Sequence, residues 1–370
     1  MRILFDGYWW YSGPLANRSV QRDLIRTWSA TFPEDELVVA TRRPVDREAE
    51  LDPPPGAPQR VRLWPQAVSN LIELPVLARR LKADVTLAHN FTPPGGRTAT
   101  FIHDVMFAEH PEWFSLAERV YFALMLPSSR MASAVFTSTR TEAERITRFA
   151  PSAKAVQEIG LAVPQALLDA VPTPPRDFGG YREFGLSVGR LNVRKNLSTV
   201  LRGVTASRSI TPDTPLLVVG SAEHSGRGDS LPDEFRELVD SGAVVFLGRI
   251  TDAELAWLYR NTALVVYLSL DEGFGLPPIE SVRFGAPLLV SDIPVLRETV
   301  SGYAEFIAAS ADPGTVGAAI DRTWNRTPHA DARERINSRY DWVEVVTRLR
   351  ASIEAGLTGT GRPRRRPSNP

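Results

Sequence analysis

Short, continuous runs of apolar residues recur along the chain and alternate with amphipathic stretches of helical period. Continuous rather than alternating apolar character is typical of strands that are buried on both faces of a parallel sheet. In the first half of the chain the predicted strands are MRILFDG, ELVVATR, RVRLWP, DVTLAHN, TATFIHDV and SAVFTST. Stretches with a helical pattern, such as SVQRDLIRTWSATF, lie between them. The pattern therefore predicts a doubly wound α/β domain.

The same pattern begins again after VPTPPRDFGGYREF, a segment rich in proline and glycine that we interpret as an interdomain linker. The strands predicted beyond it are FGLSVGR, PLLVVGS, AVVFLGR, ALVVYLSL and PLLVSDI. One connecting helix has a capping box, Thr251 with Glu254. We therefore predict an α/β protein with two doubly wound, Rossmann-like domains that face each other across a cleft. Ligands are expected at the carboxyl ends of the strands.

The predicted domain boundaries follow from these patterns. The N-terminal Rossmann-like domain covers residues 1–170 and the C-terminal one covers residues 171–345. An amphipathic stretch predicts a last helix over 341–356, which is expected to pack back on the N-terminal domain. Residues 357–370 form a basic tail, which is predicted to be disordered and solvated rather than bound to nucleic acid or lipid.

Composition and charge exclude several classes of function. Lys+Arg and Asp+Glu are balanced at 43 each, so no overall field favours nucleic acid as a partner. The sequence has no cysteine, which excludes disulfides, zinc–thiolate sites and cysteine nucleophiles. The start of the chain lacks the pattern of a signal peptide, and no apolar run approaches the ~20 residues that span a bilayer. We expect a cytoplasmic protein, with the inner face of the membrane as the alternative position and at most peripheral membrane contact.

One helical stretch, LAERVYFALMLP, carries many apolar groups. It could touch a membrane, but core packing is the preferred interpretation.

The segment DEGFGLPPIE, Asp271 to Glu280, lies between a predicted strand and a predicted helix. Its glycines let backbone N–H groups approach a ligand closely, and the start of a helix favours phosphate. Glu272 ends the strand and Glu280 lies one turn into the helix, so both carboxylates can accept hydrogen bonds from sugar hydroxyls. Either glutamate alone fits a helix-stabilising role, but the whole pattern favours a nucleotide-sugar site.

A second candidate segment, VGRLNVRKN, also joins a predicted strand to a predicted helix. Arg190 and Lys195 leave the strand end together, with Arg194 beside them. Cations at the mouth of a parallel sheet can neutralise a diphosphate leaving group. A solvated loop is the alternative interpretation.

Histidines supply a third candidate. In FIHDVMFAEHPEWF, His103 and Asp104 end an apolar run and are expected to face the cleft, although a hydrogen-bonded structural histidine is the alternative. His89 is a weaker candidate at another strand end. His110 and His224 have no such position in the predicted pattern.

Three stretches, GRLNVRKN, FLGRITDAELAWLYRNT and SLDEGFGLPPIESVRFGAPLLVSDIPVLRE, resemble the group-one retaining glycosyltransferases of the GT-B fold. The resemblance is dense from Phe184 to Glu298. It is thinner in the N-terminal half, where it rests on the strand order, the His103–Asp104 pair with its HPEWF continuation, and FTSTRTEAERI.

Residue roles follow from this resemblance alone. It implies that Glu272 holds the donor sugar together with the run Gly273, Phe274, Gly275 and Leu276. Glu280 would bind the ribose hydroxyls of the donor. Arg190 and Lys195 match the diphosphate-binding pair of the family, and Arg249 and Ile250 match the lining of the base pocket. His103, with Asp104 next to it, matches a histidine close to the anomeric carbon.

The loop after the first strand departs from the family pattern. The family often has a glycine-rich loop there, whereas this chain has YSGPLANRSV, in which Pro14 follows the single Gly13. Gly13, Asn17 and Arg18 are the predicted donor contacts. A simple helix-entry turn is the alternative.

The expected function is therefore a retaining hexosyltransferase. We expect a nucleoside diphosphate sugar as donor, with GDP- or dTDP-linked mannose or a deoxyhexose such as rhamnose favoured, and a hydroxyl of a glycan or lipid-linked acceptor. The family usually needs no metal, and the sequence has no Asp-x-Asp motif, so no metal and no cofactor are expected. The alternatives are a nucleotide-sugar epimerase of the same fold and an inactive sugar-nucleotide-binding partner. A two-carboxylate glycoside hydrolase is less favoured.

Overall fold

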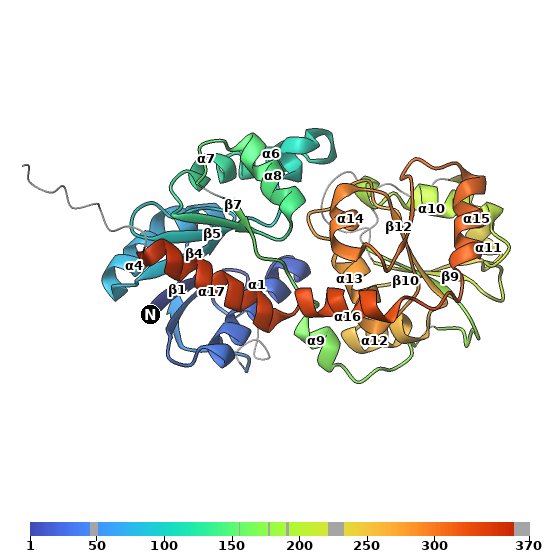
Figure 1. The fold of residues 1–370 in the computed structure, drawn as a ribbon, viewed down its shortest axis with the longest axis horizontal. Helices are drawn as coiled ribbons and strands as arrows, with labels where there is room; N and C mark the ends of the chain where they lie inside the picture. The colour runs from blue at the N-terminus through green and yellow to red at the C-terminus, as the bar shows by residue number, and fades with distance from the viewer. Residues whose placement is uncertain (45–50, 155, 177, 190–191, 221–232, 359–370) are drawn as a thin grey trace, which may run out of the picture.

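The computed structural model describes residues 1–44, 51–154, 156–176, 178–189, 192–220 and 233–358 (Figure 1). Within these residues two parallel sheets form, one in each half of the chain. The predicted α/β class with two doubly wound domains is therefore confirmed. In each sheet the strand order reverses beside the first strand, and this reversal creates the crevice in which such folds bind ligands.

The N-terminal sheet has the order β3-β2-β1-β4-β5-β6-β7, and every pairing is parallel. Its strands are β1 (Arg2–Asp6), β2 (Glu36–Thr41), β3 (Ala57–Arg60), β4 (Val85–His89), β5 (Thr98–Phe101), β6 (Ala134–Thr137) and β7 (Val156–Glu158). The helical elements are α1 (Leu15–Thr31), α3 (Gln66–Val68), η1 (Ser69–Glu73), α4 (Leu74–Leu81), α5 (Met106–Glu109), η2 (Pro111–Trp113), α6 (Leu116–Phe122), α7 (Met125–Ser129) and α8 (Arg140–Phe149).

The C-terminal sheet has the order β10-β9-β8-β11-β12-β13 and is also parallel. Its strands are β8 (Gly185–Val188), β9 (Leu216–Val219), β10 (Val244–Gly248), β11 (Leu264–Tyr267), β12 (Leu288–Ser291) and β13 (Glu305–Ile307). The helical elements are α9 (Gln165–Asp169), η3 (Val193–Lys195), α10 (Leu197–Ala206), η4 (Asp233–Phe235), α11 (Arg236–Asp240), α12 (Asp252–Asn261), α13 (Leu276–Phe284), α14 (Pro294–Val300), α15 (Pro313–Thr323), α16 (Ala330–Arg339) and α17 (Trp342–Thr358).

Two local predictions need correction, and a third is confirmed. The run RVRLWP is not a strand beyond Arg60, because the carboxylate of Glu73 accepts the backbone N–H groups of Arg62 and Leu63 in place of a neighbouring strand. The helical pattern from residue 116 to 131 is divided into α6 and α7. The capping box at the start of α12 is present as predicted.

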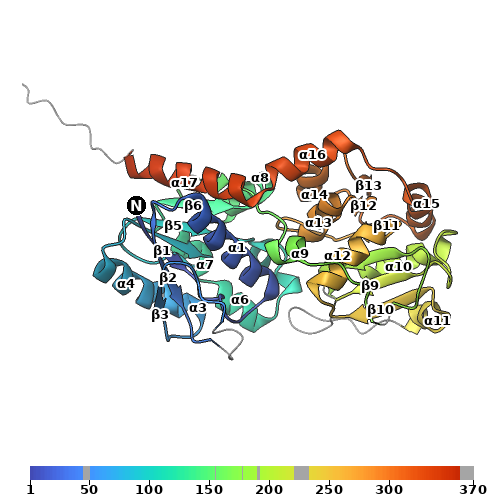
Figure 2. The same cartoon turned by 90° about the horizontal axis from the view of Figure 1, so that it is seen from below.

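The last helix, α17, leaves the C-terminal domain and lies along the N-terminal domain against α1 (Figures 1 and 2). At its start, the Trp342 indole donates to the carbonyl of Val163 at 2.9 Å. Further along, Arg350 donates to the buried carboxylate of Asp35 at 2.9 Å, and the chain's own amino terminus donates to the same carboxylate at 2.7 Å. The two domains are therefore joined a second time, by the end of the chain.

A close helix crossing in the C-terminal domain generates a stability prediction. An added Cβ at Gly317 of α15 would lie 2.6 Å from the backbone carbon of Ala206 in α10. Alanine in a helix gains up to about 1 kcal/mol over glycine, but overpacking against backbone costs about 1–3 kcal/mol. We expect Gly317→Ala to lower the free energy of unfolding by about 1 kcal/mol in denaturant titrations. Gly356→Ala, with no atom near its added Cβ, is the control and should be neutral or stabilising.

Candidate active site

The candidate site lies at the carboxyl ends of two adjacent strands in the C-terminal domain. The turn η3 follows β8 and the Asp271–Gly275 loop follows β11, and these two strands pair where the strand order reverses. Gly275 ends the loop with φ of 87°, and an added Cβ would meet the Leu296 side chain at 2.8 Å. Glycine is therefore required at the entry to α13.

Glu272 is the centre of a charge cluster. Its Oε1 accepts from Lys195 Nζ at 2.6 Å and from the Tyr267 hydroxyl at 2.7 Å, and its Oε2 accepts from Arg194 Nη1 at 2.5 Å. Burial alone would raise the pKa of Glu272, but the two cations outweigh burial and lower that pKa to about 2. Glu272 is therefore ionised, and it holds both cations at the strand ends.

Tyr267 connects the lysine to the glutamate. Its hydroxyl accepts from Lys195 Nζ and donates to Glu272, and the lysine nitrogen lies 4.6 Å from the centre of the tyrosine ring. Burial, with Glu272 next to it, raises the pKa of Tyr267 well above its usual value, so the phenol stays neutral. Because Tyr267 is the last residue of β11, the rigid sheet sets the position of the cluster.

Arg194 binds Glu272 directly, although the sequence analysis placed it only beside the predicted pair Arg190 and Lys195. The sequence prediction paired Arg190 with Lys195, but Arg190 lies outside the described residues. Arg194 binds Glu272 directly, and its backbone carbonyl accepts the N–H of Leu270 at 2.8 Å. The preceding Asn192 caps η3 by accepting the Lys195 N–H, a local signal that places the two consecutive cations on one turn.

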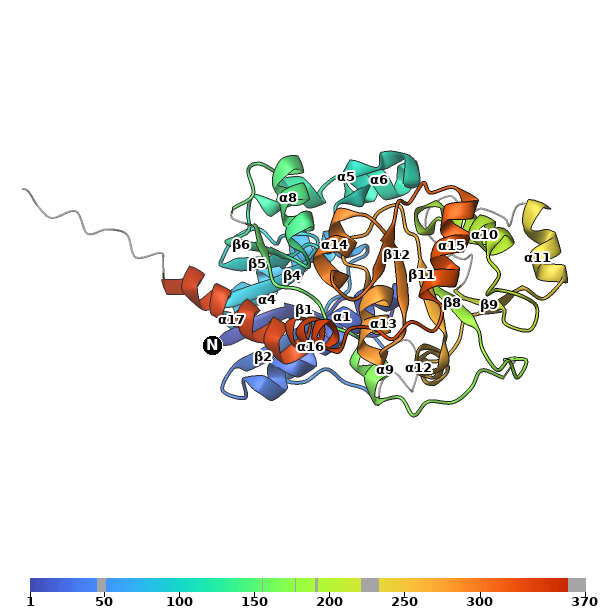
Figure 3. The same cartoon turned by 45° about the vertical axis from the view of Figure 1, so that its right-hand side comes forward.

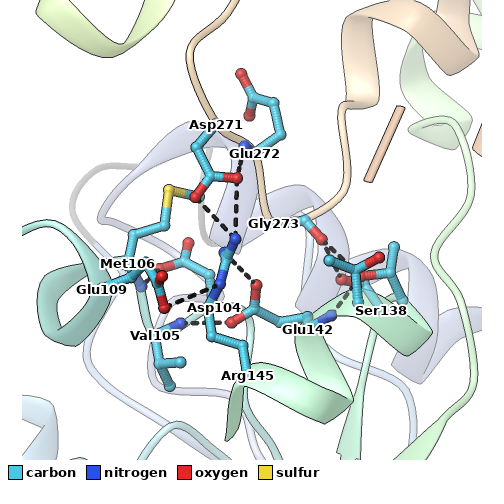
Figure 4. Close-up of polar contacts among 12 residues, drawn as sticks. Asp104, Val105, Met106, Glu109, Ser138, Glu142, Arg145, Asp271, Glu272 and Gly273 are labelled. Atoms are coloured by element: carbon cyan, nitrogen blue, oxygen red, sulfur yellow. Dashed lines mark hydrogen bonds and ion pairs between the residues drawn. The ribbon is translucent and has the colours of Figure 1, made fainter. Parts of the chain in front are cut away.

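Asp271, next to Glu272, binds two side chains of the other domain. Arg145 of α8 donates to both of its carboxylate oxygens at 3.0 and 2.8 Å (Figure 4). His110 Nε2 lies 3.1 Å from Oδ2. Arg145 also donates to the buried Glu142 at 2.9 Å. His110, which has no strand-end position in the predicted pattern, is therefore brought to this loop by the fold. No local pattern indicates this contact, because 161 positions separate His110 from Asp271.

The backbone of the loop is also held across the domain boundary. The carbonyl of Gly273 accepts from the hydroxyls of Ser138 and Thr139 at 3.0 and 3.2 Å (Figure 4). An added Cβ at Gly273 would lie 2.9 Å from Cβ of Asp104, so only glycine allows this approach. The predicted Asp104 is thus brought directly against the predicted loop.

A carboxylate of the C-terminal domain caps a helix of the N-terminal domain. Glu298 of α14 accepts the backbone N–H groups of Arg140 and Thr141 at 2.6 and 2.9 Å, and these two residues begin α8. Helices α14 and α8 lie side by side across the domain boundary (Figure 3). Free N–H groups and the positive dipole end make a helix start a favourable place for an anion. The same helix therefore receives an anion at its start and supplies Arg145 to Asp271.

The predicted His103 forms a pair with His89. His89 Nδ1 lies 3.3 Å from His103 Nε2, and the two rings stack with centroids 5.3 Å apart. Burial lowers the pKa of both histidines to about 3, and His89 adds to the effect at His103. Both imidazoles are therefore neutral near pH 7. His89 ends β4 and His103 follows the adjacent strand β5, so both lie at the carboxyl ends of the strands, where ligands are expected.

The buried carboxylate of Asp6 lies next to His89 and binds several segments of the N-terminal domain. It accepts hydrogen bonds from the backbone N–H groups of Tyr8 and His89 and from the side chains of Gln66 and Asn70, all between 2.9 and 3.1 Å. Burial raises the pKa of Asp6, and these donors oppose the rise. The Asp6 side chain thus has a structural role and joins the ends of β1 and β4.

Glu280 lies in α13 and binds the Tyr259 hydroxyl, which donates to its Oε2 at 2.7 Å. Its side chain is 7% exposed, and burial raises the pKa of Glu280 to about 7. Asp252 adds to this rise, whereas Tyr259 and Lys195 oppose it. Arg18, from α1 of the other domain, in turn opposes the raised pKa of Asp252. Arg18 and Glu280, both predicted site residues, therefore each interact electrostatically with Asp252.

The other predicted donor contacts are more dispersed. Phe274 is buried with its ring 5.1 Å from that of Tyr340, and Leu276 packs against the core, so these two offer a ligand mainly backbone. Arg249 and Gly13 lie in loops and are exposed, Ile250 lies in the same loop as Arg249 and is half-buried, and Asn17 is half-buried in the first turn of α1.

The network around Asp271 predicts a large difference between two arginines of one helix. Arg145→Gln leaves Asp271 and Glu142 buried without their cation, which typically costs about 3–5 kcal/mol. Arg148 is 59% exposed and binds the surface residue Glu109, so Arg148→Gln should change stability by no more than about 0.5 kcal/mol. Chemical denaturation of both variants measures this difference. Equal small losses would show that Asp271 does not depend on Arg145.

The raised pKa of Glu280 predicts a specific dependence of stability on pH. Between pH 4.5 and 7 the folded protein holds a proton on Glu280 that the unfolded chain has lost, so the free energy of unfolding falls as pH rises. The loss reaches at most about 3 kcal/mol. Glu280→Gln removes this dependence while keeping an oxygen for Tyr259. The variant should therefore gain stability relative to wild type between pH 4.5 and 8 in urea titrations, and a constant difference would contradict the assignment.

Comparison with known proteins finds a family and several relatives to which the chain is similar. The family model described as "Glycosyl transferases group 1" matches residues 178–339. The O-antigen chain mannosyltransferase RfbU of Salmonella typhimurium is 26% identical over 228 residues, which are 60% of this chain and 60% of the length of that relative. The O-antigen chain mannosyltransferase B of Escherichia coli is 25% identical over 273 residues, 68% of each chain.

A solved structure extends the likeness over both domains. Anabaena HepE in complex with UDP-glucose superimposes with a TM-score of 0.68, at 16% identity, over 96% of this chain and all of that one. At this identity the likeness establishes the fold, and the predicted GT-B arrangement is confirmed. The matched family model and these relatives show that the chain is similar, through residues 178–339, to the group 1 glycosyl transferases.

Proposed function

We propose that the protein transfers a hexosyl group from a nucleoside diphosphate sugar to a hydroxyl of a glycan or lipid-linked acceptor, with retention of anomeric configuration and without a metal. Mannose, or a deoxyhexose such as rhamnose, is the favoured sugar, and the donor base is guanine or thymine. The observation that carries the proposal is the pair Arg194 and Lys195, held at the strand ends by Glu272 and Tyr267.

This pair supplies positive charge where a leaving group would need it. In the transfer, the bond between the anomeric carbon and the phosphate oxygen breaks, and its electron pair leaves with the nucleoside diphosphate. The acceptor oxygen bonds to the same carbon, and its proton passes to the departing phosphate oxygen. Lys195, Arg194 and the N-terminus of α13 would stabilise the growing negative charge on the diphosphate.

Glu272 and Glu280 would bind hydroxyl groups in this reaction. Glu272 is ionised, so it can only accept hydrogen bonds, as a sugar-binding carboxylate must. Glu280 has one oxygen bound to Tyr259, and its raised pKa keeps a proton available near neutral pH. It can therefore both accept from and donate to a ribose diol.

His103 would donate a hydrogen bond rather than remove a proton. A histidine whose pKa is lowered to about 3 is a weak base at neutral pH. The neutral ring can present one N–H to the sugar while its other nitrogen faces His89. This supports a reaction in which the departing phosphate takes the acceptor proton.

The relatives support particular donors and acceptors. The two relatives described above are named as mannosyltransferases of O-antigen chains, which supports mannose and a polysaccharide or lipid-linked acceptor. The HepE complex contains UDP-glucose, which supports a nucleotide-sugar pocket in this fold but a different base. A donor screen therefore has to include UDP-sugars beside the GDP- and dTDP-sugars.

The three lysines of the chain allow a matched test. The donor is chosen by thermal shift, because a ligand that binds the folded state raises the melting temperature. Lys195→Ala should then lower transfer at least about 100-fold, since it removes a cation from the developing charge. The exposed Lys154→Ala should transfer as wild type does. Product formation is measured by mass spectrometry and its anomeric configuration by NMR, with and without a chelator.

Each rival activity gives a different result in the same assay. Conversion of the donor without any acceptor would identify an epimerase. Donor binding without turnover across a panel of glycan acceptors would identify an inactive binding partner. Wild-type turnover by the folded Lys195→Ala variant would remove the basis of the proposal, and inversion at the anomeric carbon would contradict retention.

A further inference from the structure

Three arginines line a cavity of about 270 Å³ at the carboxyl ends of helices α12 and α13. Arg260 lies in the last turn of α12, Arg283 in the last turn of α13, and Arg333 in α16. The other described residues that line the cavity, Leu168 and Phe284, are apolar, so no carboxylate is among them. We refer to this cavity as the arginine pocket.

The arginine pocket lies where four helices meet. Helix α9 packs against α12, α12 packs against α13, and α13 packs against α16 (Figure 1). Helix α9 belongs to the stretch of chain that leads from the N-terminal sheet to the C-terminal sheet, and α16 precedes α17, which returns to the N-terminal domain. Leu168 and Arg333 therefore bring both connections between the domains to one cavity.

This pocket is separate from the candidate active site. Helix α13 begins after Gly275, and Arg283 lies eight positions further along, about 12 Å at the rise of an α-helix. The ring of Phe284 stacks on that of Tyr259 with centroids 5.7 Å apart, and Tyr259 is the residue that binds Glu280. A ligand in contact with Phe284 would therefore be one pair of aromatic rings away from the candidate site.

Helix capping explains one of the three arginines. Cations near the end of a helix interact favourably with its free carbonyl groups and its dipole. Arg333 does so for α13, because its Nε donates to the carbonyl of Val282 at 3.1 Å and its Nη2 to that of Arg283 at 2.7 Å. An added Cβ at Gly285 would lie 3.1 Å from Arg333 Cζ, so the guanidinium lies close against the backbone. Arg333 is thus fixed at the wall of the pocket.

The other two arginines are not required as caps. At the end of α12, the Asn261 side chain and the Thr262 N–H already donate to helix carbonyls, at 2.8 and 2.9 Å. The guanidinium of Arg260 instead lies over the ring of Phe284, 5.5 Å from its centre. Neither Arg260 nor Arg283 pairs with a carboxylate within the described parts of the chain. Like charges gathered in this way repel one another, and a bound anion would remove that cost.

A wider groove of about 890 Å³ adjoins the pocket and shares Arg283 and Arg333 with it. The other polar side chains that line the groove supply hydroxyl, amide and carboxylate groups, and they are Thr327, Glu334, Asn337, Ser338, Asp341 and Glu344. Such groups form hydrogen bonds with neutral hydroxyls, whereas the carboxylates among them would repel a second anionic group. The groove therefore suits a neutral, hydroxyl-rich body that carries its negative charge at one end.

We propose that the arginine pocket binds the phosphate group of a phosphorylated, hydroxyl-rich small molecule, whose neutral part lies in the adjoining groove. Guanidinium groups match the oxygens of a phosphate in charge and in geometry. The apolar side chains of Leu168 and Phe284 exclude water beside them, which strengthens such contacts. A polyanion fits less well, because the groove carboxylates would face its further charges. The inference does not depend on the proposed transferase activity.

Calorimetric titration of the full-length chain at physiological ionic strength tests the proposal with three probes: inorganic phosphate, glucose 6-phosphate and glucose. Glucose 6-phosphate should bind more tightly than inorganic phosphate, and glucose should show no binding. Arg260→Gln/Arg283→Gln should weaken binding of glucose 6-phosphate at least about tenfold, because each lost hydrogen bond to a charged group costs about that much affinity. Arg202→Gln/Arg208→Gln removes the same charge from exposed arginines elsewhere in the domain and should bind as wild type does.

A second variant separates the arginine pocket from the candidate active site. Lys195→Ala should bind glucose 6-phosphate as wild type does, because Lys195 binds Glu272 in the loop before α13, at the other end of that helix. Loss of binding in Lys195→Ala, with binding retained in the folded Arg260→Gln/Arg283→Gln variant, would overturn the proposal. Donor binding and transfer are measured separately, so a failure of the proposed function would be distinguished from a failure of this one.

Three further outcomes would also overturn the proposal. They are an absence of saturable binding by wild type, equal losses in the variant at Arg202 and Arg208, and binding of inorganic phosphate as tight as that of glucose 6-phosphate. Tighter binding of tripolyphosphate than of glucose 6-phosphate, lost in Arg260→Gln/Arg283→Gln, would identify a polyanion site instead. Circular dichroism and the melting temperature without ligand show whether each variant is folded.

Discussion

Asp271 and Glu272 are adjacent and both buried, and a buried carboxylate persists as an anion only where cations and hydrogen-bond donors surround it. The cationic partners of the two residues come from different domains. Glu272 is neutralised by Arg194 and Lys195 of its own domain, whereas Asp271 is neutralised by Arg145 of the other. One dipeptide therefore fixes the cations of the candidate site and also fixes the loop against the N-terminal domain.

The glycines around this dipeptide follow from the same constraint. The Asp271–Gly275 loop contacts both domains closely and leaves no room for side chains at two positions. Gly273 lies against Asp104, and Gly275 lies against Leu296. The positive φ of Gly275 then turns the chain into α13, and the carbonyl of Gly273 remains available to Ser138 and Thr139 of the neighbouring domain. The Asp271–Gly275 loop therefore connects the two domains in addition to its proposed role in ligand binding.

Features that depend on neighbouring residues could be predicted from local sequence patterns, whereas contacts between residues far apart in the sequence could not. Buried parallel strands have continuous apolar runs, and the capping box of α12 is four residues long, so both were predictable. The choice of Arg194 as the partner of Glu272 depends on how η3 turns. The contact of His110 with Asp271 depends on how two domains meet, and no local pattern records it. The sequence could not decide whether the apolar residues of LAERVYFALMLP face the core, because periodicity shows an apolar row but not its direction. In the structure Leu116 and Val120 are exposed.

The arrangement of Glu272 also limits how a ligand can enter. Both of its oxygens are bound to cations, so in this state the carboxylate already compensates one of the two positive charges of Arg194 and Lys195. In the proposed reaction a diphosphate would compete with Glu272 for Lys195 and Arg194, and Glu272 would exchange those contacts for sugar hydroxyls. Tyr267 bonds to the lysine and the glutamate together, so it can hold either one while the other moves. The ion pair then keeps the cations desolvated and in position before the donor arrives, which is the condition for electrostatic stabilisation without reorganisation.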